Sequence, residues 1–178
     1  ITPAGRVAIE LTDTAVDAEF EPAHLGVGDG DLVVVTGGAR GITAALSTEL
    51  DRLTRCVPVL LGRTALGEPE PSGLAEATDE PAIKRALNEH HTYEHPAELG
   101  EACQRILSQR EVRATLSDIQ ALGVTPVYRS VDIRDPEALE RALEELVHEY
   151  GPIRGIVHGA GVIADRLVEE KVPEQLAM

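Results

Sequence analysis

The stretch Leu32-Val33-Val34-Val35-Thr36-Gly37-Gly38-Ala39-Arg40-Gly41-Ile42-Thr43 decides the fold of this 178-residue chain. Its first four residues are all apolar, which is typical of a strand buried on both faces of a parallel sheet. A glycine-rich turn and the start of a helix follow. Such a turn lets backbone N–H groups approach a pyrophosphate, although glycines at this spacing also occur in ordinary strand-to-helix packing. The stretch predicts strand, turn and helix, and leaves both explanations of the glycines open.

Three further apolar runs follow the first, with helical patterns between them. The four predicted strands are Leu32–Thr36, Cys56–Gly62, Thr125–Asp132 and Ile153–Gly159. Each is rich in β-branched residues and is bounded by turn residues. This alternation predicts an α/β fold with a doubly wound (Rossmann) parallel sheet, incomplete in this chain and covered by helices on both sides.

Two of the intervening helices have recognisable patterns. Asp135 is suited to cap a helix that has Pro136 in its first turn and ends at Gly151-Pro152. A longer pattern covers Pro96–Leu122, but its apolar face drifts near Gln109–Arg110. One helix with a break there and two helices in tandem both fit this second pattern.

The chain divides into a lead-in and one domain. Residues 1–30 predict a lead-in segment with one short strand near Val7–Leu11, and residues 31–178 form the doubly wound domain. Residues 65–96 are too polar and too long for an ordinary connection between helix and strand. We expect a helical insertion there, with a short helix near Pro81–His90.

Composition excludes several classes of protein. Sixteen Lys and Arg against 31 Asp and Glu give a formal net charge of −15, which disfavours nucleic acid and anionic membranes as partners. No apolar run is long enough to span a bilayer, and neither cysteine has metal or disulfide spacing, so a cytoplasmic location is expected. Three histidines lie in the polar insertion without nearby cysteines, and we expect no metal there: His90, His91 and His95.

The second predicted strand ends at Leu61-Gly62-Arg63-Thr64, about twenty residues after the glycine turn, where this fold reads the adenosine ribose. An acid at that place selects NAD, but here the residue is Arg63. A guanidinium binds a 2′-phosphate through charge-assisted hydrogen bonds, so NADPH is favoured, with Arg40 in the turn as an assisting group. The alternative is a solvated surface arginine.

The last two predicted strands also end in small or polar residues. Val131-Asp132-Ile133 closes the third, and His158-Gly159-Ala160-Gly161 follows the fourth. Ligands bind at the carboxyl edge of doubly wound sheets. Taken singly, Asp132 is equally a helix cap or turn residue, and His158 equally a satisfied strand-end histidine.

With these motifs in order, the chain from roughly Gly30 to Met178 resembles the short-chain dehydrogenase/reductase superfamily. It is most similar to the ketoreductase domains of multidomain polyketide and polyunsaturated fatty-acid synthases. The resemblance rests on five motifs: Thr36–Ile42, Leu61–Thr64, Val131–Ile133, Gly151–Gly161 and Lys171–Gln175. It implies that residues 31–178 are the NADP-binding half of such a ketoreductase.

The resemblance also implies roles for individual residues. The turn glycines and Ile42 would hold the pyrophosphate, Arg63 the 2′-phosphate, Asp132 the adenine edge, and Gly159–Gly161 the ribose next to the nicotinamide. The complete set expected at the NADPH site is Thr36, Gly37, Gly38, Arg40, Gly41, Ile42, Gly62, Arg63, Thr64, Asp132, Ile133, His158, Gly159, Ala160 and Gly161.

Two departures from the family pattern matter. The family usually has glycine at Thr43, a position that packs helix on sheet, so a looser contact or a shifted helix is expected. The family's catalytic Ser, Tyr and Lys are not recognisable here, because none of these residues has their context: Tyr93, Tyr128, Tyr150, Lys84 and Lys171. We expect that catalytic trio after Met178.

The activity implied by the resemblance is reduction of a β-ketoacyl thioester by NADPH to a β-hydroxyacyl thioester. The expected partners are the acyl carrier protein that carries the substrate, the remaining half of the ketoreductase and other synthase domains. The present chain alone is expected to be inactive. Two alternatives remain open: a non-catalytic structural subdomain of a synthase, which typically lacks the glycine-rich turn, and a subdomain that senses nucleotide without turnover.

Overall fold

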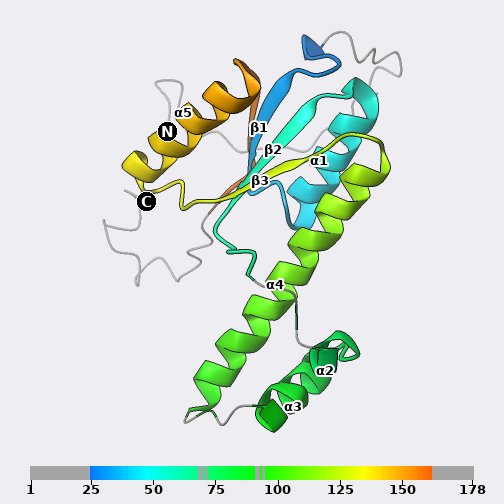
Figure 1. Ribbon diagram of the computed structural model, residues 1–178, viewed down its shortest axis with the longest axis vertical. Coiled ribbons are helices and arrows are strands. Elements are labelled where there is room, and N and C mark those ends of the chain that lie inside the picture. Colours follow the sequence, from blue (N-terminus) through cyan, green and yellow to red (C-terminus); the bar gives the residue numbers. More distant parts are fainter. Residues whose placement is uncertain (1–24, 68–69, 71, 91–92, 94, 162–178) are drawn as a thin grey trace, which may run out of the picture.

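The computed structural model describes residues 25–67, 70, 72–90, 93 and 95–161 (Figure 1). The predicted lead-in strand near Val7–Leu11 lies outside these residues. In chain order the elements are β1 (Leu32–Thr36), α1 (Gly41–Thr54), β2 (Val57–Gly62), α2 (Ser72–Ala75), α3 (Glu80–His90), α4 (Pro96–Ala121), β3 (Val127–Ser130), α5 (Pro136–Tyr150) and β4 (Ile153–His158).

The four strands form one parallel sheet in the order β3-β2-β1-β4. From β1 the chain first moves outward through β2 to β3, and then returns to place β4 on the other side of β1. The carboxyl ends of β1 and β4 therefore mark the point where the winding direction reverses, which is where doubly wound sheets bind ligands. The predicted fold class is confirmed.

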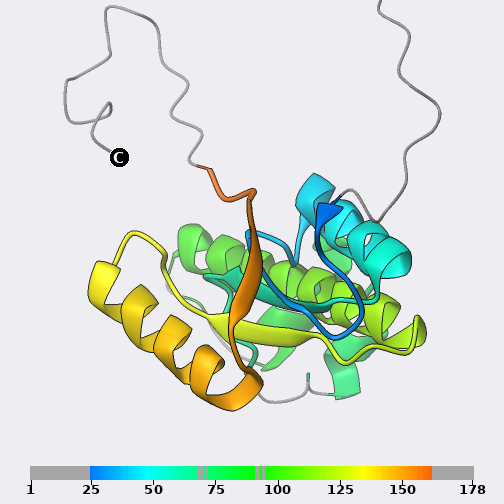
Figure 2. The same ribbon diagram turned by 90° about the horizontal axis from the view of Figure 1, so that it is seen from above.

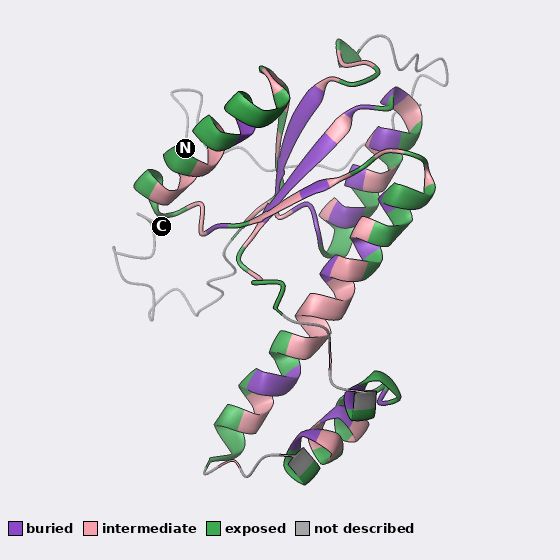
Figure 3. Cartoon of the chain, viewed as in Figure 1, coloured by how far each residue is buried: buried purple, intermediate pink, exposed green. Residues whose placement is uncertain are grey.

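Helices cover both faces of the sheet (Figures 1 and 2). Val33 and Val35 of β1 face α4 and α1, whereas Val34 belongs to the core under α5. All residues of β1 are buried, and Figure 3 shows the purple colour continuous along it. This confirms the prediction that a strand apolar at every position is buried on both faces.

Helix α4 is continuous from Pro96 to Ala121, which answers the question left open by its drifting apolar face. Its first half packs Ala102 and Cys103 against α2 and α3, while its second half packs Val112 and Ile119 against the sheet. The drift therefore reflects a change of packing partner along one helix. Figure 1 shows the insertion, α2 and α3, lying beside the end of α4 away from the sheet.

Helix α5 has the limits that the sequence predicts, whereas β3 is shorter at both ends than the predicted strand Thr125–Asp132. The Asp135 side chain accepts a hydrogen bond from the Ala138 N–H, as expected of the cap of α5. Strand β3 ends at Ser130, earlier than predicted. One more ladder hydrogen bond follows, from the Val131 N–H to the Gly62 carbonyl at 2.8 Å, and the pairing then stops. Asp132 therefore lies in the turn before α5 and not in the strand.

Candidate functional site

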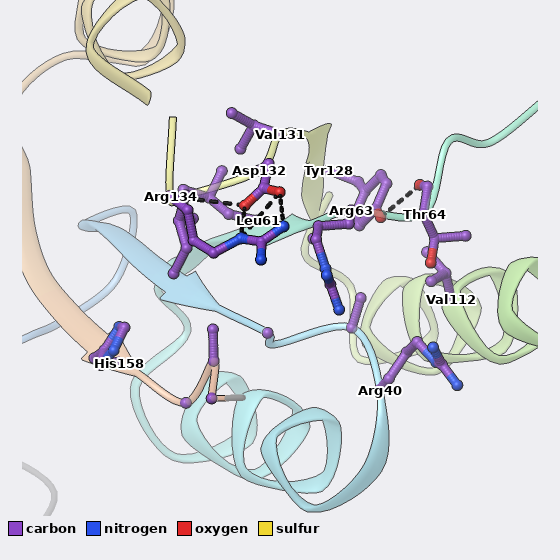
Figure 4. Close-up of a pocket in the computed structure, with 17 residues that line it drawn as sticks. Arg40, Leu61, Arg63, Thr64, Val112, Tyr128, Val131, Asp132, Arg134 and His158 are labelled. Atoms are coloured by element: carbon purple, nitrogen blue, oxygen red, sulfur yellow. Dashed lines mark hydrogen bonds and ion pairs between the residues drawn. The ribbon is translucent and has the colours of Figure 1, made fainter. Parts of the chain in front are cut away.

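A cavity of about 1000 Å³ lies at the carboxyl edge of the sheet (Figure 4). The segments that follow β1, β2, β3 and β4 form its wall, and α4 contributes Val112. This volume is at the upper end of the range for small-molecule sites. The predicted site residues that line it are Gly37, Arg40, Gly62, Arg63, Thr64, Asp132, Ile133, His158, Gly159, Ala160 and Gly161.

The turn between β1 and α1 needs its glycines for two different reasons. Gly37 and Gly41 have φ angles of +70° and +57°, which side chains disfavour. A Cβ on Gly37 would also lie 3.1 Å from the Ala160 backbone, so the loops after β1 and β4 touch here. Gly38 instead faces the core, where a Cβ would meet Val35 and Leu60 below 3.0 Å. Both the ligand-site and the packing explanations therefore apply, each to different glycines.

Thr36 joins the ends of β1 and β4. Its hydroxyl accepts a hydrogen bond from the Ala160 N–H at 3.2 Å and lies 2.8 Å from Nδ1 of His158. The Gly159 N–H donates to the Thr36 carbonyl at 3.1 Å. These contacts hold the His158–Ala160 segment against the glycine turn. Thr36 itself does not line the cavity but positions the segment that does.

Thr43 and Gly159 are matched in size. A Cβ on Gly159 would lie 2.4 Å from Cγ2 and 2.6 Å from Oγ1 of Thr43. The space that Thr43 needs at the start of α1 is thus available because the loop after β4 has no side chain there. This close fit accounts for threonine at a position where glycine was expected, and it is not a loose contact.

At the end of β2, Tyr128 supports the segment that carries Arg63. The Tyr128 hydroxyl donates to the Thr64 carbonyl at 2.7 Å, and burial raises the pKa of this phenol. Gly62 leaves the room for that ring, since a Cβ there would lie 3.0 Å from the hydroxyl oxygen. Arg63 extends into the cavity and, in the view of Figure 4, lies between Asp132 and Arg40.

Asp132 and Arg134 form a forked ion pair in the segment that follows β3. Arg134 Nη2 lies 2.6 Å from Oδ2, and its Nε and backbone N–H donate to Oδ1 at 3.0 and 3.1 Å. These hydrogen bonds lower the pKa of Asp132 to about 2, with a smaller contribution from the charge of Arg63. Asp132 therefore stays ionised at any physiological pH and its carboxylate is held in one orientation.

Arg40 pairs with a residue of α4. Its Nε donates to Oε2 of Glu111 at 2.7 Å, and Oε1 of Glu111 accepts the Gly41 N–H at 2.9 Å. The hydrogen bond from Arg40 lowers the pKa of Glu111. Arg40 occupies the cap position of α1, but its own side chain makes no capping hydrogen bond. A carboxylate from a distant helix therefore covers the N-terminus of α1.

Sequence reasoning placed some residues differently and missed others. Thr36, Gly38, Gly41 and Ile42 do not line the cavity, and Ile42 is 91% exposed. A backbone role at a phosphate remains a prediction for these four. Six further residues line the cavity that the predicted site did not include: Ala39, Leu61, Val112, Tyr128, Val131 and Arg134. Three of them lie inside the quoted motifs, Ala39, Leu61 and Val131, whereas no motif marks the other three.

The cavity residues provide several positively charged groups. A Cβ on Gly41 would meet nothing within 4 Å, although its N–H is hydrogen-bonded to Glu111 at 2.9 Å. Arginine side chains from three segments surround the cavity: Arg40, Arg63 and Arg134. Positive charge concentrated in a chain of net charge −15 suits an anionic ligand.

In the part of the chain that the structure describes, no three side chains of His, Cys, Asp or Glu come together as metal ligands would. No helix in that part is long and apolar enough to cross a membrane. His91 lies outside that part. The absence of a metal at the histidine cluster therefore remains a prediction.

Similar proteins were found by sequence. The chain is 33% identical over 156 residues to a polyunsaturated fatty acid synthase protein of Thraustochytrium sp., covering 82% of this chain and 6% of that protein. It is 33% identical over 167 residues to 5-methyl-1-naphthoate synthase of Streptomyces sahachiroi, covering 93% and 8%. The chain therefore spans less than a tenth of either relative.

Solved structures share the fold. A ketoreductase from the macrolactin assembly line superposes with a TM-score of 0.55 at 19% identity, covering 90% of this chain and 24% of that one. A ketoreductase domain from the bacillaene assembly line gives 0.50 at 25% identity, covering 82% and 25%. Residues 32–178 match the family model described as the KR domain. That match spans the parallel sheet and every segment of the cavity, so the chain belongs to the ketoreductase (KR) domain family.

Proposed function

We propose that this chain is the NADPH-binding part of a ketoreductase that reduces a β-ketoacyl thioester on an acyl carrier protein to a β-hydroxyacyl thioester. The observation that carries the cofactor preference is Arg63, which enters the cavity from the end of β2. The relatives support the setting, since both are synthases far longer than this chain.

The charges around the cavity favour Arg63 as the contact to a 2′-phosphate. Arg40 is paired with Glu111 and Arg134 with Asp132. Among the residues that the structure describes, Arg63 has no carboxylate within ion-pair distance, although it adds to the lowering of the pKa of Asp132. Its guanidinium is therefore the least compensated charge in the cavity and the best placed to meet a phosphate.

The roles of the chain are binding and orientation. A bound nicotinamide would supply the hydride for the carbonyl carbon of the substrate. The Thr36–His158–Ala160 contacts would hold the loop against which the nicotinamide ribose lies, and Asp132 would accept a hydrogen bond from the adenine. Proton donation would come from catalytic residues elsewhere in the parent protein, so we expect no turnover by this chain alone.

Calorimetry with NADPH and NADH tests the proposal. The wild type should bind NADPH about tenfold to a hundredfold more tightly, because two or three charge-assisted hydrogen bonds reach the phosphate. Arg63→Ala should remove most of this preference, whereas Arg85→Ala in α3, an exposed arginine outside the cavity, should leave it unchanged. The preference should grow as pH rises through about 6, where a phosphomonoester gains its second charge.

Two results would contradict the proposal. Equal affinities of the wild type for the two nucleotides would remove the cofactor preference. No measurable binding of either nucleotide would favour a structural subdomain instead.

A further inference from the structure

Glu111 binds the two groups of the glycine turn that are best suited to an anion. One is the guanidinium of Arg40, 2.7 Å from Oε2, and the other is the N–H of Gly41, 2.9 Å from Oε1. Gly41 is the first residue of α1, so its N–H carries part of the positive end of the helix dipole. A guanidinium and a helix N-terminus are also the donors that proteins use for phosphate.

The ion pair between Arg40 and Glu111 is exposed enough for another anion to replace Glu111. The Arg40 and Glu111 side chains are 48% and 42% exposed, and ion pairs with that exposure contribute little net stability because water and salt screen them. The lowered pKa of Glu111 keeps its carboxylate charged at neutral pH. Protonation therefore does not relieve the repulsion between this carboxylate and an incoming phosphate.

The packing of α4 directs the Glu111 side chain toward the glycine turn. The next residue, Val112, is buried and lines the cavity, and one turn later Thr115 donates its hydroxyl to the Ala39 carbonyl at 3.0 Å. Both contacts fix the rotation of α4 against the glycine turn. The carboxylate of Glu111 is thus presented at the rim of the cavity by a rigid helix.

We propose that Glu111 is a specificity-determining residue whose carboxylate competes with the cofactor's phosphates for Arg40 and the Gly41 N–H. This inference rests on the proposed function for the identity of the ligand. By neutralising Arg40, Glu111 leaves Arg63 as the main group that distinguishes NADPH from NADH. The same competition limits the affinity of the site for the nucleotide and so favours its dissociation.

Inorganic pyrophosphate tests the competition without any assumption about the nucleotide. In NMR titrations that follow the Gly41 amide, Glu111→Gln should bind pyrophosphate about threefold to tenfold more tightly than the wild type. The glutamine side chain in this variant keeps the shape and helix propensity of glutamate but carries no charge. Glu101→Gln, an exposed acid of the same helix, should bind pyrophosphate as the wild type does.

Calorimetry then tests specificity. Glu111→Gln should raise the affinity for NADPH by a similar factor and that for NADH by less, and the additional gain for NADPH should disappear in Arg40→Ala/Glu111→Gln. A gain equal for both nucleotides would overturn the specificity role. Unchanged or weaker pyrophosphate and NADPH binding would overturn the competition and make Glu111 a positioning residue for Arg40. Failure of the proposed function is distinct, because neither nucleotide would then bind any variant while the pyrophosphate result could still hold.

Discussion

Thr43 and Gly159 show how two single residues adjust the site to each other. The Thr43 side chain fills the space that any β-carbon on Gly159 would require. The two residues come from α1 and from the loop after β4, and both lie where the glycine turn meets the wall of the cavity. A change at one should therefore depend on the other.

A double-mutant cycle tests this dependence. Gly159→Ala should destabilise the wild type by about 1–3 kcal/mol, because the new methyl overlaps Thr43. In a Thr43→Ala background the same change should cost clearly less. Gly155→Ala serves as the control, since its Cβ would meet Val27 and Val33 at 3.4 Å and its cost should not depend on Thr43. Urea denaturation measures the free energy of unfolding of each variant. Strictly additive effects of the Thr43 and Gly159 changes would contradict the proposed fit between these two residues.

Asp51 of α1 is a buried acid with a different consequence. It is 1% exposed, and neither carboxylate oxygen has a hydrogen-bond partner among the described residues. Burial raises its pKa, so folding favours the protonated form. The charged form therefore costs stability at neutral pH, and this cost is lost as pH falls from the raised folded-state pKa to the ordinary pKa of an aspartate.

We expect Asp51→Asn to stabilise the protein by about 1–2 kcal/mol at pH 7.5 and by progressively less as pH falls to about 4, near the ordinary pKa of aspartate. The control is Glu49→Gln in the same helix, where the hydrogen bond from Arg52 lowers the pKa of the acid and the change should bring no gain. Thermal melting across this pH range measures both. A gain from Asp51→Asn that does not vary with pH would show that charge burial is not its cause.

At the scale of elements, α4 connects the insertion to the cavity through its middle turns. Arg110 makes a fork to the Glu70 carboxylate and also donates to the carbonyls of Leu74 and Ala77. Neighbouring Gln109 donates to the Ala65 carbonyl at 2.7 Å. Gln109 and Arg110 thus hold the segment that follows β2, while the next residue, Glu111, contacts the glycine turn after β1.

We expect Arg110→Lys to loosen the insertion without unfolding the sheet, because lysine keeps the charge but cannot replace the planar fork. Hydrogen exchange should accelerate in α3 and stay slow in β1. Arg105→Ala, an exposed arginine of the same helix, should change neither rate. Equal acceleration in α3 and β1 would mean that the insertion and the sheet unfold as one unit.

At the scale of the whole molecule, the residues that the structure describes cover one face of the sheet only in part. Ile156 of β4 is in register with Val34, whose side chain is buried in the core under α5, yet Ile156 is 70% exposed. In the described residues β4 also pairs only with β1. An apolar edge of this kind seeks a partner. We propose that the following segment of the parent polypeptide pairs along Ile153–Gly159 and brings the catalytic Ser, Tyr and Lys.

Sedimentation of the chain tests this proposal. The wild type should self-associate through β4, and Ile156→Lys should shift it toward the monomer. Leu46→Lys, on the surface of α1 at 45% exposure, should have little effect. Extending the chain by roughly 150 residues of its parent, about one domain, should abolish association and allow turnover of a β-ketoacyl thioester. A stable monomer of the present chain that reduces the thioester would contradict the proposal.

The sequence alone was sufficient for features that depend on neighbouring residues. The all-apolar run of β1, the glycine turn and the cap at Asp135 were readable because strand burial, backbone angles and helix capping leave local patterns. The alternation of strands and helices then predicted a parallel sheet, and with it the edge at which Arg63, Asp132 and His158 meet. The long pattern over Pro96–Leu122 stayed ambiguous because periodicity does not say which partner a face packs against.

Only the tertiary structure decided which distant residues act on one another. Glu111 meets Arg40 across 71 positions of sequence, and nothing near either residue indicates the contact. The fit of Thr43 to Gly159 and the hydrogen bonds from Arg110 to Glu70 likewise join residues that are distant in sequence. Such pairs arise from the way each helix crosses the sheet and from its rotation, which the packing of the whole core sets and no local pattern records.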